Sequence, residues 1–220
     1  MFRLICLLIG YCIGCIQNAY ILGRVTKKID IRQHGSGNAG TTNTIRVLGV
    51  ASGAIVLAGD FLKAVLAVVL CSLLFGGGGT FAPVLPANIL PDTFLAETGL
   101  LPGLYAGLGV IAGHDFPVIL KFKGGKGFAS LLGLVLALDW RVALITYAVV
   151  IILLAVTRYV SLSALVMSLV TPFLLLAFGH GIEVFGGMLA LTALTWWRHK
   201  ENIQRLAEGK ENRLSLGKKG

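Results

Sequence analysis

The stretch VLGVASGAIVLAGDFLKAVLAVVLCSLLF, residues 47–75, contains only two charged side chains, Asp60 and Lys63. About 20 apolar residues in a helix span the roughly 30 Å hydrocarbon core of a bilayer, so this stretch is long enough to cross a membrane. The whole chain shares this character, because 56% of its 220 residues are hydrophobic and 13% are charged. Soluble domains carry about 25% charged residues. We therefore predict an all-α, polytopic integral membrane protein.

Six further apolar stretches accompany residues 47–75, at residues 2–23, 100–119, 127–138, 142–156, 162–178 and 184–197. The sequence thus predicts seven transmembrane helices that form a single helical domain over residues 1–220. Residues 127–138 are too few to cross a full bilayer alone. We expect this segment either to take in residues from its flanks or to lie in a thinned region where protein surrounds it.

Basic residues alternate between the connecting segments. Lys and Arg are frequent in residues 24–46 and 121–126 and in the tail from Arg198, whereas residues 76–99 contain neither. Because cytoplasmic connections carry the excess of Lys and Arg, this pattern predicts an external N-terminus and a cytoplasmic C-terminus. Three polar loops, at about 24–46, 113–127 and 198–220, then face the cytoplasm, and residues 76–99 form a loop at the opposite interface.

The net charge and the cysteines are two further features of the composition. The net charge of +9 is distributed between apolar runs, so we interpret it as topology rather than as a nucleic-acid surface. The cysteines are expected to be buried thiols, because no further ligands follow at zinc spacing. They are Cys6, Cys12, Cys15 and Cys71. Scattered acidic residues predict no metal site.

The first polar loop contains QHGSGNAGTTNT, residues 33–44, followed by Arg46. Its glycines match G-x-G-x-x-G, but the strand that a dinucleotide-binding unit requires is missing. Closely spaced glycines before a helix still let backbone N–H groups converge on an anion. The candidate ligands are Ser36, Gly37, Asn38, Thr41, Thr42, Asn43 and Arg46. The alternative is a linker in which Asn43 or Thr44 caps the next helix.

The second loop is GHDFPVILKFKGGKG, residues 113–127. Its last lysine precedes Gly127 rather than Ser or Thr, so this is no Walker A sequence. The glycines nevertheless allow close backbone approach to an anion, whereas lysines alone could be membrane anchors. The candidates are His114, Lys121, Gly124, Gly125, Lys126 and Gly127. His114 is either an imidazole base or a structural histidine.

The tail, residues 199–212, supplies a third polar segment with candidates Asn202 and Glu211, and a solvated tail is the alternative. Ser161 and Ser163 are expected near the same membrane face. Asp60 and Lys63 lie one helical turn apart and can pair, with a functional or a structural role. Because all three loops face one compartment, we expect them to bind two anionic groups beside an apolar bundle.

Three sequences carry a specific resemblance: GSGNAGTTNTIRVLG, GHDFPVILKFKGGKGFA and NIQRLAEGKE. In this order between membrane spans, they closely resemble the motifs of the bacterial acyl-phosphate-dependent glycerol-3-phosphate acyltransferases. The resemblance implies transfer of an acyl chain from acyl phosphate to the 1-hydroxyl of glycerol 3-phosphate, giving lysophosphatidic acid and phosphate. It also implies a site that faces the cytoplasm at the bacterial inner membrane, in contact with the lipid bilayer. The motif positions carried over are Ser36, Arg46, His114, the glycines with Lys126, Asn202 and Glu211.

The implied chemistry needs no cofactor, because an acyl phosphate is already an activated mixed anhydride. Ser36, Arg46 and His114 are the expected catalytic residues, acting by orientation and electrostatic stabilisation. We favour a substrate phosphate over His114 as the proton acceptor. Oligomeric state stays open, and a monomer suffices. A small anion transporter and a structural scaffold for lipid enzymes are the competing classes.

Overall fold

The computed structural model describes residues 1–76, 78–81 and 99–214. Most of the predicted loop 76–99, and residues 215–220 of the third polar segment, lie outside the described residues. The described elements are helical: α1 (Phe2–Gly14), α2 (Asn18–Lys27), η1 (Ile31–Gln33), α3 (Thr41–Leu48), α4 (Val50–Phe75), α6 (Leu101–Asp115), η3 (Val118–Leu120), α7 (Phe128–Leu138), α8 (Trp140–Thr157), α9 (Val160–Ala177), α10 (Ile182–Arg198) and α11 (Lys200–Ala207).

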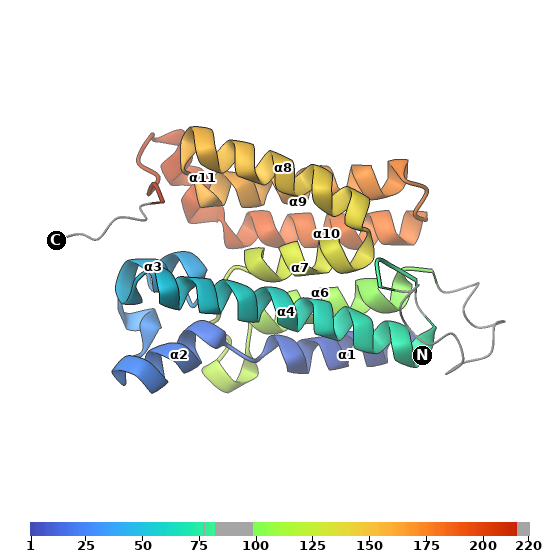
Figure 1. Ribbon diagram of the computed structural model, residues 1–220, viewed down its shortest axis with the longest axis horizontal. Coiled ribbons are helices and arrows are strands. Elements are labelled where there is room, and N and C mark those ends of the chain that lie inside the picture. Colours follow the sequence, from blue (N-terminus) through green and yellow to red (C-terminus); the bar gives the residue numbers. More distant parts are fainter. Residues whose placement is uncertain (77, 82–98, 215–220) are drawn as a thin grey trace.

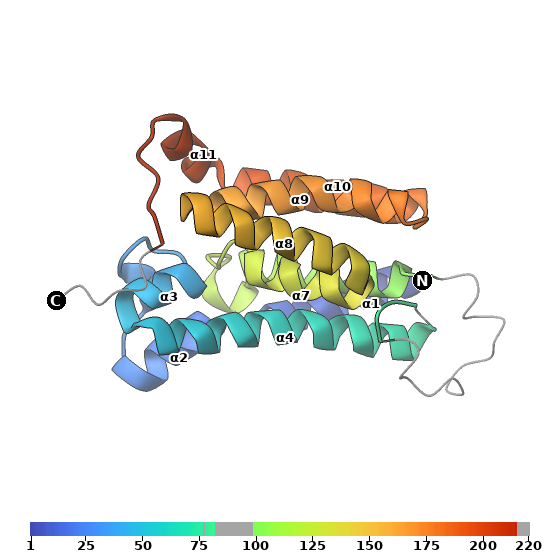
Figure 2. The same ribbon diagram turned by 45° about the horizontal axis from the view of Figure 1, so that its top comes forward.

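The long helices run side by side in two groups (Figure 1). Helices α1 and α4 form one group, α8, α9 and α10 form the other, and α7 lies between them in both views (Figure 2). Helix α6 packs against α1, α4, α7 and α10, so it joins the groups. The short helices α2, α3 and α11 gather at one end of the bundle (Figure 1).

Within the described residues, five segments are long and apolar enough to cross a membrane: Phe2–Lys27, Val50–Phe75, Leu101–Leu120, Trp140–Thr157 and Val160–Ala177. Helix α7 has only 11 residues, as the short apolar run predicted. It packs against α4, α6, α8 and α9, and most of its side chains are buried. The alternative in which protein surrounds this short segment is confirmed.

The first apolar run is not the single helix over 2–23 that we predicted. Helix α1 ends at Gly14 and α2 begins at Asn18. A helix that stops inside a membrane leaves carbonyl groups that need donors. Lys63 supplies them, because its Nζ donates to the carbonyl oxygens of Gly14 at 3.2 Å and Ile16 at 2.7 Å. The break is therefore stabilised from α4, which no pattern in residues 2–23 reveals.

Three smaller expectations also need correction. Residues 47–75 are divided at Gly49, whose φ of 91° separates α3 from α4. The first polar loop contains the start of a helix, since α3 begins at Thr41. Cys12 is exposed, unlike the other three cysteines, because it shares the outward face of α1 with Leu8, four residues earlier.

Helices α1 and α6 pack backbone against backbone through two pairs of glycines. Gly10 and Gly14 lie four residues apart on α1, and Gly109 and Gly113 do so on α6. A Cβ atom on any of these glycines would overlap main-chain atoms of the facing helix. Small residues at this spacing bring membrane helices into close contact, where van der Waals packing holds them together.

We expect Gly109→Ala to destabilise the protein, because the added methyl group would overlap the Leu7 carbonyl of α1. Overpacking of this kind costs about 2 kcal/mol, equivalent to a fall of roughly 5 °C in the midpoint of thermal unfolding in detergent. Gly186→Ala is the matched control, because a Cβ at that helical glycine meets no atom within 4 Å. Equal midpoints for both variants would contradict the packing described here.

Candidate functional site

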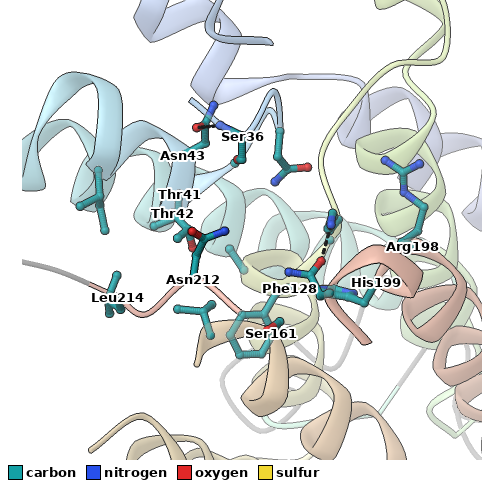
Figure 3. Close-up of a pocket in the computed structure, with 18 of the residues that line it drawn as sticks. Ser36, Thr41, Thr42, Asn43, Phe128, Ser161, Arg198, His199, Asn212 and Leu214 are labelled. Carbon is teal, nitrogen blue, oxygen red and sulfur yellow. Dashed lines mark hydrogen bonds between the residues drawn. The ribbon is translucent and has the colours of Figure 1, made fainter. Parts of the chain in front are cut away.

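A cavity of about 790 Å³ lies at the end of the bundle where α3 and α11 gather (Figures 1 and 3). All three polar segments contribute to its wall. The lining includes most of the residues predicted from the sequence: Ser36, Gly37, Asn38, Thr41, Thr42, Asn43, Arg46, His114, Gly124, Lys126, Gly127, Ser161, Asn202 and Glu211. The three segments, far apart in the chain, therefore meet at one site.

Four helices begin at this cavity. Its lining contains the first residues of α3, α7, α9 and α11, which are Thr41 and Thr42, Phe128 and Ala129, Val160 and Ser161, and Lys200 and Glu201. The N-terminus of a helix carries a partial positive charge and N–H groups without intrahelical partners. The cavity also contains the cations Arg46, Lys126, Arg198, Lys200 and Arg205. This arrangement suits bound anions, phosphate groups above all.

Asn43 holds the first loop in shape. Its Oδ1 accepts a hydrogen bond from the Ser36 N–H at 2.8 Å. Its Nδ2 donates to the carbonyl oxygens of Ile31 at 3.1 Å and His34 at 2.9 Å. Gly35 and Gly37 take positive φ angles of 62° and 73°, which side chains rarely tolerate. Asn43 thus orders the backbone around Ser36, which lies beside it in Figure 3.

Arg32 ties the first loop to the second. Its guanidinium pairs with Asp30 at 2.7 Å. Its Nη1 donates to the carbonyl oxygens of Leu120 at 3.1 Å and Lys123 at 3.3 Å. These bonds fix the distance between two motif loops that are separated by more than one membrane helix.

The predicted pair of Asp60 and Lys63 forms, with Nζ 2.9 Å from Oδ1. Lys63 Nζ also lies 2.9 Å from Nδ1 of His114. A lysine ammonium paired with a carboxylate can only donate, so Nδ1 of His114 accepts and the neutral ring carries its proton on Nε2. Nε2 faces Gly125, where a Cβ would collide with it. His114, which lines the cavity, is therefore arranged as a hydrogen-bond donor rather than as a base.

Arg198 joins the end of α10 to the second motif. Its Nη2 donates to the carbonyl oxygen of Gly125 at 2.6 Å. The guanidinium stacks over the Phe116 ring, 5.0 Å from its centroid, and lies 3.6 Å from the buried carboxylate of Asp115. Figure 3 shows Arg198 and His199 side by side at the cavity.

Glu211 fastens the tail to the rest of the site. Its Oε1 accepts from Ser161 Oγ at 3.1 Å and from Asn202 Nδ2 at 2.7 Å. Its Oε2 accepts from Arg205 Nε at 2.8 Å. Asn202 Oδ1 in turn accepts from Lys126 Nζ at 2.5 Å. The third motif is thereby connected to the lysine of the second.

The cavity is also lined by apolar side chains, from Leu57 of α4, Phe128 and Leu132 of α7, and Val150 and Leu154 of α8. Because α7 packs against both α4 and α8, we call this part of the cavity the apolar groove and its α7 residues the groove floor. A polar, cationic end joined to an apolar groove matches an amphipathic ligand with an anionic head.

Comparison with known proteins agrees with this geometry. The family model described as glycerol-3-phosphate acyltransferase matches residues 4–209 of the chain. The chain belongs to this family. A glycerol-3-phosphate acyltransferase of Thermoanaerobacter pseudethanolicus is 38% identical over 214 residues, covering 97% of this chain and 96% of the relative. One from Nitrobacter winogradskyi is 42% identical over 212 residues, covering 96% and 95%.

Solved structures show the same relationship in three dimensions. The glycerol 3-phosphate form of PlsY (YgiH), an integral membrane glycerol 3-phosphate acyltransferase, superposes with a TM-score of 0.80. The two sequences are 30% identical, and the match covers 97% of this chain and 96% of that one. The lysophosphatidic acid form of PlsY gives a TM-score of 0.78.

Three residues predicted for the site lie outside the lining of this cavity. Lys121 is exposed in the turn after η3, with φ of 54°. Gly125 is buried, and its N–H donates to the His114 carbonyl at 3.0 Å. Ser163 is also buried, and its Oγ donates to the Tyr159 carbonyl one turn earlier at 3.3 Å. Gly125 and Ser163 are thus bonded to other parts of the fold, and their place in the site stays a prediction.

Several residues that line the cavity were not predicted from the sequence: Trp197, Arg198, His199, Lys200, Glu201, Arg205, Asn212 and Leu214. They belong to the end of α10 or to the tail. The one available signal was their position beside Asn202 in a polar segment that follows a membrane span. His199 Nδ1 lies 2.8 Å from the Thr195 carbonyl, and burial lowers the pKa of His199 to about 4, so its ring is neutral.

We expect Glu211→Ala to destabilise the protein and to lower its acyltransferase activity, because Ser161, Asn202 and Arg205 would lose their common acceptor. Leaving such partners unpaired costs about 1–3 kcal/mol. Thermal unfolding in detergent and an activity assay on the same samples measure both effects. The control is Glu208→Ala, since the Glu208 side chain is 42% exposed and that of Glu211 only 5%. If both variants matched the unmodified protein, Glu211 would have no such role.

Proposed function

We propose that this protein transfers an acyl chain from an acyl phosphate to the 1-hydroxyl of glycerol 3-phosphate, releasing lysophosphatidic acid and inorganic phosphate. The glycerol-3-phosphate acyltransferase activity and its lysophosphatidic acid product follow from the family and from the two forms of PlsY. The choice of acyl phosphate as donor rests on one observation. A single cavity joins five cations and four helix N-termini to an apolar groove, as a donor with a phosphate head and an acyl tail requires.

In this proposal the polar end of the cavity holds two phosphate groups close together. Arg46, Lys126 and the N-termini of α3 and α7 offset the repulsion between them. Ser36 and His114 Nε2 donate to the oxyanion that develops at the acyl carbonyl. Because an acyl phosphate contains a good leaving group, the protein contributes orientation and charge rather than a covalent intermediate.

The proton of the attacking hydroxyl passes to a substrate phosphate. A phosphate monoester has a second pKa near 6, so its dianion accepts a proton at neutral pH. His114 is unsuited to this step, because its Nδ1 accepts from Lys63. In this proposal His114 donates a hydrogen bond to the oxyanion, and a substrate phosphate accepts the proton of the hydroxyl.

We further propose seven membrane crossings, with α7 and α10 added to the five longer segments, an external N-terminus and a cytoplasmic site in the bacterial inner membrane. The start of the chain and α11 lie at opposite ends of the bundle, as an odd number of crossings requires (Figure 1). The basic segments 24–46, 121–126 and 198–213 lie at the end that carries the cavity, which supports a cytoplasmic location.

The deciding experiment uses purified protein in detergent, where no compartments exist for transport. Release of phosphate from an acyl phosphate should require glycerol 3-phosphate and should accompany formation of lysophosphatidic acid. We expect Ser36→Ala and Arg46→Ala to reduce turnover by about 10²-fold or more, because each removes a contact to developing charge. His114→Ala should reduce turnover less, and Lys28→Ala, an exposed cation outside the cavity, should leave it unchanged.

Turnover with acyl thioesters but not acyl phosphates would overturn the donor assignment. Complete loss of activity in His114→Ala, together with loss of a titration near neutral pH, would overturn substrate assistance. A protein without turnover that binds phosphate would instead belong to the transporter class.

The charge of Lys126 should make the KM for glycerol 3-phosphate depend on pH. Burial lowers the pKa of Lys126 below its usual range, so its ammonium loses its charge at a lower pH than an exposed lysine does. The KM for glycerol 3-phosphate should therefore rise on the alkaline side before the usual lysine range is reached. Lys126→Arg should move this rise to higher pH, because a guanidinium stays charged.

The matched control is Lys121→Arg, an exposed lysine of the same motif that lies outside the cavity lining. Its KM profile should coincide with that of the unmodified protein. An alkaline rise that is the same in all three proteins would show that Lys126 does not carry the phosphate charge.

A further inference from the structure

The apolar groove has a definite direction. Helix α7 packs against both α4 and α8 and lies between them (Figure 1). Leu57 of α4 and Val150 and Leu154 of α8 therefore face each other across α7. An acyl chain that starts at the phosphate end would run along α7, away from the motif loops.

Tyr147 lies outside the lining of the cavity, just beyond its apolar part. It lies on α8, three residues or about one helical turn beyond Val150 in the direction away from the motif loops. Its hydroxyl donates to the carbonyl oxygen of Leu132 on α7 at 2.5 Å. The phenol ring thus spans the two helices at the last residue of the groove floor, where a chain running along α7 would meet it.

The hydrogen bond fixes the position of the ring. The Leu132 carbonyl belongs to a helix, so the bond anchors the ring to rigid backbone rather than to a mobile side chain. The ring is half-buried and packs against the main core cluster, which also contains Val142, Val150 and the buried side chains of α7. Tyr147 is therefore a fixed wall at the end of the groove.

The groove is short compared with a membrane lipid chain. From Phe128 to Leu132 its floor covers five residues, a rise of about 6 Å, within a hydrocarbon layer of roughly 30 Å. Only the part of a long chain nearest the carbonyl fits between the phosphate end and Tyr147. The rest must leave the groove sideways, into lipid.

We propose that Tyr147 is a specificity-determining residue that ends the acyl groove, so that the protein grips the carbonyl-proximal part of the acyl chain while the distal part lies in the bilayer. This inference rests on the proposed function, since it assumes an acyl phosphate donor. A wall at Tyr147 would make the enzyme selective for substituents near the carbonyl of the acyl chain and tolerant of substituents near the chain end.

The test uses a series of saturated acyl phosphates that carry a phenyl ring at the chain terminus, in steps of increasing chain length. In the unmodified protein, kcat/KM should pass through a minimum at the length that places the ring against Tyr147, about tenfold below its neighbours. It should recover for longer chains, whose ring lies in detergent or lipid. Tyr147→Ala should remove the minimum.

Two controls separate this role from a general structural one. Tyr147→Phe keeps the ring and should keep the minimum, and Ile151→Ala removes an exposed side chain of the same helix and should leave the profile unchanged. A purely structural effect of Tyr147→Ala would lower kcat/KM by one factor at every chain length. If Tyr147→Ala does not fold, Tyr147→Leu provides the same test with a smaller cavity.

The outcomes are distinct. A minimum that persists at the same length in Tyr147→Ala or Tyr147→Leu would overturn the assignment of Tyr147 as the wall. A flat profile in the unmodified protein would overturn the path along α7. If the protein turns over no acyl phosphate, including those without the terminal phenyl ring, the proposed donor would be wrong.

Discussion

The structure depends on the hydrogen bonds that reach the free carbonyl groups of a helix that ends inside the membrane. Helix α1 ends at Gly14, and the carbonyl oxygens of Gly14 and Ile16 both accept from Lys63. In hydrocarbon no water can replace this donor, so the break requires a buried cation, and the cation requires its partner Asp60. The same ammonium sets the tautomer of His114. One ion pair thereby links the path of the first helix to the chemistry of the site.

The break also explains how the first motif reaches the cavity. After it, α2 turns across the end of the bundle, and Ile31, Ala39 and Val56 bury one another in a small cluster with Ala19. The first loop is consequently held on both sides, by this cluster and by the bonds from Arg32 to the second loop. A loop fixed in this way can present its backbone to an anion without reorganising when the anion binds.

The cationic end of the cavity and its apolar groove lie next to each other in this fold. Helices α3, α7, α9 and α11 all begin at the cavity, so their N-termini place partial positive charge where five cations line its wall. Helix α7 then leads from that charged end into the membrane interior between α4 and α8. Helix α7 is too short to cross a bilayer alone, so protein rather than lipid must surround its ends.

Residue types and their spacing determined much of this protein. The apolar runs fixed the helical membrane class, and the glycines and cations of three motifs identified most of the cavity lining, because both depend on local composition. Only the tertiary structure decided which side chains serve the substrate region and which serve the fold. Asn43, Gly125 and Glu211 look like ligands in sequence, yet each bonds to other parts of the chain. Arg198 and Tyr147 gain their roles from partners on other helices. The break after Gly14 likewise depends on Lys63, far along the chain, and a local pattern cannot encode such a distant donor.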